Sequence, residues 1–153
     1  VTPLLQSRFA ERNGAISPDG RWLAYEADDS GRFEIYVRPY PDINAGLSPV
    51  STDGGTKPLW TKNGQELIYV SATGALMRVG VSRGTSWSAT NPSIVVKEGY
   101  ATNPVWWGRS YDVSPDGQRF LMIREGAGGA SPPASLVVVQ NWVEELKRLV
   151  PTK

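Results

Sequence analysis

A polar turn followed by an alternating strand occurs three times along the chain, and this repeat constrains the fold more than any other feature. The three copies are residues 16–27, 60–72 and 113–125. Each starts with an apolar residue, passes through a polar turn that ends in glycine, and continues as a run in which apolar residues alternate with others. Glycine tolerates positive φ, and the Pro, Asp and Asn residues before it favour tight turns. The repeat predicts hairpins, so we expect an all-β protein.

The spacing of the repeat indicates how many strands each unit holds. The turn glycines Gly20, Gly64 and Gly117 are 44 and then 53 residues apart. A second strand is expected after each copy, at residues 34–39, 75–81 and 135–140. Outer strands are expected at residues 47–51 and 93–97. Periods of about 40 to 50 residues with four strands are typical of β-propeller blades. The sequence therefore predicts four-stranded antiparallel blades, with an insertion around residues 100–108.

The end of the chain departs from this pattern. Residues 141–150 carry apolar side chains at helical spacing, Asn141 can cap the first turn, and Pro151 follows the last one. We expect a short amphipathic helix here. It either packs on the edge of the propeller or binds a partner.

Composition excludes several classes of function. The chain contains no Cys and no His, which excludes disulfides, zinc–thiolate sites and histidine-based triads. The segment 80–84 fits a GxSxG pattern, but without His it is not a catalytic elbow. The net charge of +1 and the absence of a basic run argue against nucleic-acid binding. The apolar runs are too short to cross a bilayer, so no membrane insertion is expected. Nothing at the start of this sequence has the pattern of a signal peptide.

Four segments also carry a family resemblance: residues 17–41, 51–60, 111–123 and 141–153. They resemble the WD40-like Asp-propeller (PD40) repeat of TolB-like proteins. More narrowly, they resemble the C-terminal propeller part of bacterial eukaryotic-like serine/threonine kinases, although no kinase motif is present. The resemblance covers essentially the whole chain. It implies a six-bladed propeller of which one chain supplies half, in a parent protein that is extracytoplasmic (periplasmic or on the cell surface).

The resemblance further implies how the single domain, residues 1–153, is divided. The expected parts are an orphan outer strand (1–9), blade 1 (10–52), blade 2 (53–98), blade 3 (99–140) and the C-terminal helix (141–150). Three blades cannot close a ring, and open ends would leave apolar faces and strand edges in water. We therefore expect a homodimer in which residues 3–6 of one copy complete the last blade of the other. A truncated fragment that associates loosely is the alternative.

Candidate site residues follow from the same alignment, because propeller ligands usually bind where the innermost strands begin. Aligning the blades on their turn glycines superposes residues 11–13, 55–57 and 108–110. The candidates for ligand binding in the channel are Glu11, Arg12, Lys57, Arg109, Asp112, Tyr111 and Trp107. Asp112 differs from its equivalents, Ala15 and Leu59, and a carboxylate buried at that position would require a hydrogen bond, a cation or a metal. The aromatic residues Tyr100, Trp106, Trp107 and Tyr111 are expected to pack over the channel or at the junction between blades, or to form an aromatic wall of the channel.

Two functions from different classes fit these residues. The first is a binding or assembly module that recognises a peptide, a protein or a small anionic ligand, with Arg12, Lys57 or Arg109 pairing with the anion. The second is a metal-dependent hydrolase in which Asp112 and Glu11, doubled by the second copy, hold Ca²⁺ or another hard divalent cation. No cofactor is certain from sequence. The same polar groups could also simply satisfy one another in a wet channel.

Overall fold

The computed structural model describes residues 3–82, 84, 86–102 and 108–124, and the described part is all-β. Its strands are β1 (Glu11–Ile16), β2 (Trp22–Ala27), β3 (Glu34–Pro39), β4 (Ser48–Pro49), β5 (Gly55–Trp60), β6 (Glu66–Ser71), β7 (Leu76–Gly80), β8 (Ser93–Val96), β9 (Tyr111–Val113) and β10 (Phe120–Met122). One 3-10 turn, η1 (Ile43–Ala45), precedes β4. The strand expected at 135–140 and the helix expected at 141–150 lie outside the described residues.

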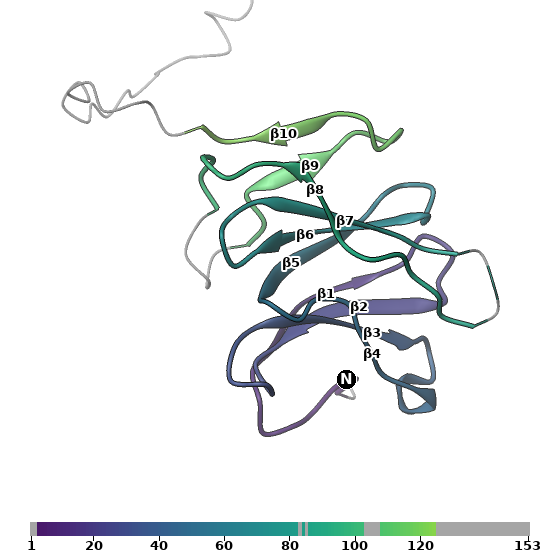
Figure 1. Ribbon diagram of the computed structural model, residues 1–153. Helices are drawn as coiled ribbons and strands as arrows, with labels where there is room; N and C mark the ends of the chain where they lie inside the picture. Colours follow the sequence, from purple (N-terminus) through teal and green to yellow (C-terminus); the bar gives the residue numbers. More distant parts are fainter. Residues whose placement is uncertain (1–2, 83, 85, 103–107, 125–153) are drawn as a thin grey trace, which may run out of the picture.

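The strands form three antiparallel sheets, each a simple meander. The first sheet has the order β1-β2-β3-β4, the second has the order β5-β6-β7-β8, and the third contains β9 and β10. Figure 1 shows the sheets stacked on one another, with the second between the first and the third. The prediction of four-stranded antiparallel sheets is confirmed for the first two repeats. This architecture is compatible with propeller blades.

The repeated turns form as the sequence predicts. Gly20, Gly64 and Gly117 have φ values of 71°, 67° and 72°, a region open to glycine at little cost. In each turn the residue before glycine accepts a backbone hydrogen bond on its side chain, from the residue that follows glycine. These bonds hold the innermost strand and the next strand in the same register in every repeat.

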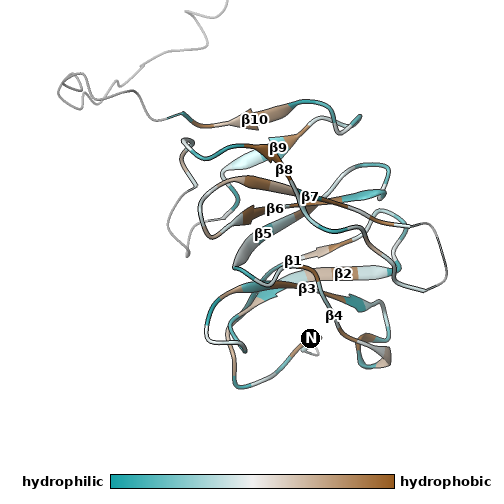
Figure 2. Ribbon diagram, viewed as in Figure 1, coloured by the Kyte–Doolittle hydropathy of each residue, from teal (hydrophilic) through white to brown (hydrophobic). Residues whose placement is uncertain are grey.

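Two apolar interfaces hold the stack together. The first interface, between the first and second sheets, buries Trp22, Ala24, Ile35, Val37, Trp60, Leu67, Tyr69 and Val79. The second interface, between the second and third sheets, buries Ile68, Val70, Leu76 and Tyr111, with Phe120 and Met122 against them. Because alternate residues of β6 point to opposite faces, the second sheet contributes to both interfaces. Figure 2 shows the apolar colour in β6, β7 and β8, while several connecting turns are hydrophilic.

The outer side of the first sheet carries a smaller apolar cluster. Leu23, Tyr25 and Ala27 are buried there, and Leu5 and Ile43 pack against them. Residues 3–6, expected to form an outer strand, are not in a strand in the single chain. A strand requires a hydrogen-bonded neighbour, and the predicted neighbour belongs to a second copy.

Candidate functional site

The expected site residues lie where three innermost strands begin. Glu11 and Arg12 start β1, Lys57 lies near the start of β5, and Tyr111 and Asp112 start β9. Arg109 precedes β9 by two residues. Trp107 lies outside the described residues. The structure joins several of these positions through a residue that the sequence did not single out, Glu26.

Glu26 is fully buried in β2, opposite Arg12 in the antiparallel register. Arg12 Nε lies 2.9 Å from Glu26 Oε1. The contact is an ion pair without hydrogen-bond alignment, since neither atom has a hydrogen-bond partner. The other carboxylate oxygen, Oε2, accepts the backbone N–H of Lys57 at 2.5 Å. Glu26 therefore connects the first sheet to the second at the end where their innermost strands begin.

A bulge makes the Lys57 backbone available for these contacts. Lys57 has φ 57°, and the pairing of β5 with β6 shifts between Thr56 and Leu59. A left-handed residue in a bulge turns its peptide groups out of the ladder. The Lys57 N–H consequently reaches Glu26, while its carbonyl accepts the Tyr111 hydroxyl at 2.6 Å. We call Arg12, Glu26, Lys57 and Tyr111 the Glu26 cluster.

Burial shifts the pKa of two groups of the Glu26 cluster, Lys57 and Tyr111. The Lys57 residue is buried, and its Nζ donates to the carbonyl of Thr102 at 3.2 Å. Burial lowers the pKa of Lys57, the charge of Glu26 acts in the opposite direction, and the charge of Arg12 lowers it further. Burial also raises the pKa of Tyr111 far above its ordinary value, so this phenol stays neutral and acts as a hydrogen-bond donor.

Within the described part of the chain, Arg12 has a ring contact on one side and an unpartnered donor on the other. Its guanidinium carbon lies 3.5 Å from the centre of the Phe33 ring, within range of a cation–π contact. Nη2 of Arg12 is buried and, among the described residues, has no hydrogen-bond partner. Such a donor is costly unless something satisfies it. Glu26 offsets the charge of Arg12 but does not use all of its donors.

Arg109 and Asp112 lie on the third sheet. Arg109 Nε donates to the carbonyl of Tyr111 at 3.1 Å, and its guanidinium carbon lies 5.9 Å from the Tyr111 ring centre. Asp112 is exposed, and its Oδ1 accepts the N–H of Val113. Both residues line a hollow of about 350 Å³ together with Ser110, Tyr111, Leu121 and Ile123. Because Asp112 is exposed in the single chain, its charge requires no counter-ion there.

The described residues contain no cluster of carboxylates that could hold a metal ion. No group of three or more Asp and Glu side chains gathers anywhere in 3–82, 84, 86–102 and 108–124. Glu11 belongs to the first sheet and Asp112 to the third, with the second sheet between them. A calcium site held by these two residues and their copies stays a prediction about an assembled ring.

The sequence pattern of β2 does indicate that Glu26 is buried. Trp22, Ala24 and Glu26 alternate onto one face of β2, and the first two are buried in the first interface. A glutamate in phase with buried apolar residues indicates a buried carboxylate, which must be paired. Glu26 lies near the end of β2, a second strand, and so falls outside the set of residues at the starts of the innermost strands β1, β5 and β9.

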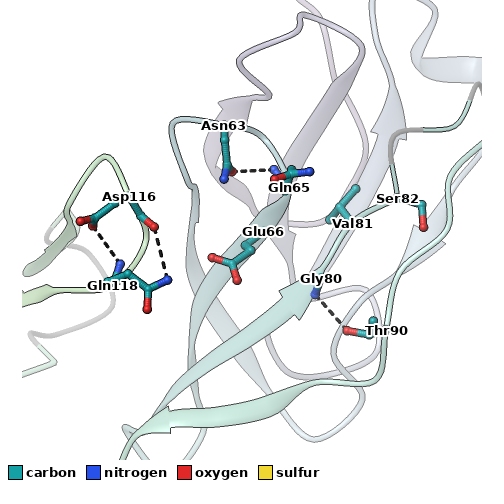
Figure 3. Close-up of a pocket in the computed structure, with 9 residues that line it drawn as sticks. All are labelled: Asn63, Gln65, Glu66, Gly80, Val81, Ser82, Thr90, Asp116 and Gln118. Carbon is teal, nitrogen blue, oxygen red and sulfur yellow. Dashed lines mark hydrogen bonds between the residues drawn. The ribbon is translucent and has the colours of Figure 1, made fainter.

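A second hollow, of about 490 Å³, lies at the other end of the innermost strands (Figure 3). Its lining comes from the turns and strand ends of the second and third sheets: Asn63, Gln65, Glu66, Gly80, Val81, Ser82, Thr90, Asp116 and Gln118. Much of it is already hydrogen-bonded internally. Asn63 accepts the N–H of Gln65, Asp116 accepts that of Gln118, and Glu66 lies 3.5 Å from Arg78. Arg78 Nε, beside Glu66, is buried without a hydrogen-bond partner among the described residues, but Arg78 Nη2 donates to the Gly117 carbonyl. In the Glu26 cluster both Nε and Nη2 of Arg12 are buried without such a partner, so this cluster is the stronger candidate for a ligand.

No protein-family model matches the chain, and no curated protein matches its sequence significantly. Among the described residues, no helix is long and apolar enough to cross a membrane.

Proposed function

We propose that this chain is a TolB-like β-propeller binding module that recognises an anionic ligand where its innermost strands begin. The observation that carries the proposal is the convergence of the Arg12 guanidinium and the Lys57 backbone N–H on one buried carboxylate, Glu26. Arg109 is linked to them through Tyr111. Three cations from three sheets thus serve one end of the stack, and the buried Arg12 donor lacks a hydrogen-bond partner among the described residues.

The chemistry favours a carboxylate or phosphate group on the ligand. Guanidinium groups present parallel N–H donors that match the two oxygens of a carboxylate or phosphate. Glu26 is engaged by Arg12 and by the Lys57 backbone N–H, and the Tyr111 hydroxyl by the Lys57 carbonyl. The Arg109 side chain is exposed and so can meet a ligand. An acidic segment of a peptide or protein, or a small anion, fits this arrangement.

The module, in this proposal, acts as a ring completed by a second copy. Three stacked sheets have two free end faces, and a two-fold pair covers both. The pair would also place two copies of each cation around one channel.

Titration calorimetry with an Asp-rich peptide and with inorganic phosphate tests the anion site. We expect Arg109→Gln to weaken binding of at least one probe about tenfold or more, the loss of one charge-assisted contact. Arg119→Gln is the matched control, because Arg119 is an exposed arginine at the turn end of the third sheet. The proposal would be contradicted if the wild-type protein bound neither probe. It would also be contradicted if Arg109→Gln and Arg119→Gln weakened binding equally.

The same instrument addresses the metal hypothesis. Ca²⁺ binding that disappears in Asp112→Asn, with no anion binding, would favour a metal site over an anion site. Anion binding that persists in Asp112→Asn and in the presence of a chelator supports the proposal made here.

A further inference from the structure

The third sheet ends the described stack with an apolar face. Leu121 is 75% exposed and Ile123 is 54% exposed. Hollows of about 350 and 410 Å³ lie on this sheet, and Asp112 and Leu121 line both. Tyr111, Phe120 and Met122 point the other way and pack into the second interface. Side-chain alternation therefore directs Leu121 and Ile123 away from the second sheet.

The repeat shows what covers this face elsewhere in the same chain. Aligned on the turn glycines, Leu121 corresponds to Ile68 and to Ala24. Both equivalents are fully buried, Ala24 in the first interface and Ile68 in the second. At each internal position, the cover is the opposite face of the sheet that follows. The Leu121–Ile123 face is thus a receiving face that lacks a following sheet among the described residues.

The first sheet presents the complementary face. Ile16 is equivalent to Trp60, which is 6% exposed in the first interface and donates its indole N–H to the Ala15 carbonyl. Ile16 itself is 47% exposed, because no sheet precedes it in the described chain. The two ends of the stack therefore expose the same two repeat positions that the internal interfaces bury.

The N-terminal segment indicates how the ends would meet. Leu5 packs on Leu23, Tyr25 and Ala27, on the outer side of the first sheet. Val50 and Val95, which lie in or just after the outermost strands β4 and β8, pack in the same way into the first and second interfaces. Leu5 thus occupies the place of an outermost-strand residue of a preceding blade.

From these equivalences we infer that the Leu121–Ile123 face binds the first sheet of a second copy, on the side of Ile16. In that arrangement, residues 3–6 of the second copy lie beside the third sheet as its outermost strand. A two-fold axis produces the contact twice, so both free faces of both copies are covered. The inference rests on the ring in the proposed function and identifies the residues that close it.

The test is the absolute mass in solution, by light scattering after gel filtration of the full chain. We expect wild type to have the mass of two chains of 16.7 kDa each. Leu121→Asp and Ile16→Asp should each reduce the mass to that of one chain, because either places a charge in the proposed contact. Ile94→Asp is the control, since Ile94 is 60% exposed on β8, outside both end faces.

The masses of the wild-type protein and the variants separate the inference from the proposed ring. Far-UV circular dichroism shows whether a variant has kept its strands, and all three positions are exposed enough to accept Asp. If both the wild-type protein and Leu121→Asp have the mass of two chains, the inference is overturned, although self-association remains. A wild-type mass of one chain would overturn both the inference and the ring, since something other than a second copy would then cover the face. The anion titration is unaffected by either result.

Discussion

At the scale of single residues, Glu26 links two positions that the sequence pattern selected, Arg12 and Lys57. It is buried in the first interface, and it pairs with Arg12 of its own sheet and with the Lys57 backbone of the next sheet. Sequence reasoning found Arg12 and Lys57 because both lie at strand starts. It could not show that they share a carboxylate, because that contact depends on the way two sheets stack.

Glu26→Gln should destabilise the fold. The substitution keeps the volume and one acceptor oxygen but leaves the Arg12 charge without a partner. Breaking a buried pair costs about 3–5 kcal/mol, and the partial exposure of Arg12 reduces the expected loss to about 2 kcal/mol. Urea unfolding measures this loss of the free energy of unfolding. Asp19→Asn is the control, because Asp19 and Arg21 form an exposed pair worth less than about 1 kcal/mol. Equal losses in the two variants would show that Glu26 has no special role.

At the scale of elements, local sequence predicts the turns that follow the innermost strands but not the bulges within these strands. The three turns were predictable, because Gly20, Gly64 and Gly117 provide the positive φ that these turns require. The bulges were not. Asn13 and Lys57 occupy equivalent positions with φ values of 51° and 57°, and lysine disfavours this region by about 1–2 kcal/mol. Contacts from Glu26 and Tyr111 hold Lys57 there, so tertiary structure overrides local preference.

Gly55, at the start of β5, should tolerate no side chain. A Cβ there would lie 2.5 Å from Ser51 Oγ and 2.7 Å from Ile35 Cγ1. Ser51 Oγ also donates to the buried carboxylate of Glu34, so movement would disturb a second buried acid.

We therefore expect Gly55→Ala to cost about 2–3 kcal/mol, within the range for overpacking. Gly14→Ala is the matched control on β1, because its Cβ would meet Leu23 at an ordinary 3.6 Å. Thermal unfolding of both variants checks the difference. Comparable melting temperatures would mean that the second sheet can shift to make room.

At the scale of the whole molecule, the described fold is a series of similar sheets held by two apolar interfaces, each of which includes a tyrosine. Tyr69 lies in the first interface and Tyr111 in the second. Burial, and then the charges of Glu34 and Asp53, raise the pKa of Tyr69 to about 12. Burial raises the pKa of Tyr111 further. Ionising either phenol would place a charge between two sheets.

Stability should therefore fall at alkaline pH. A folded-state pKa above the unfolded value of 10.0 means that the contribution is complete below pH 10 and is lost as pH rises through about 12. Urea midpoints measured from neutral pH upward should decrease in this window. Tyr69→Phe should show a shallower decrease than wild type. Identical slopes for the two proteins would exclude ionisation of Tyr69 as a cause.

The bulge at Lys57 also bears on how the stack comes apart. Arrays of similar units often lose their terminal units one at a time, because each unit contacts only its neighbours. Here one residue of the middle sheet is bonded on its amide side to the first sheet and on its carbonyl side to the third. Opening either outer sheet removes a partner that keeps Lys57 in its disfavoured conformation, and relaxation of Lys57 then weakens the remaining bond. We therefore expect the first and third sheets to depend on one another through Lys57, so that the array unfolds more cooperatively than stacked repeats usually do.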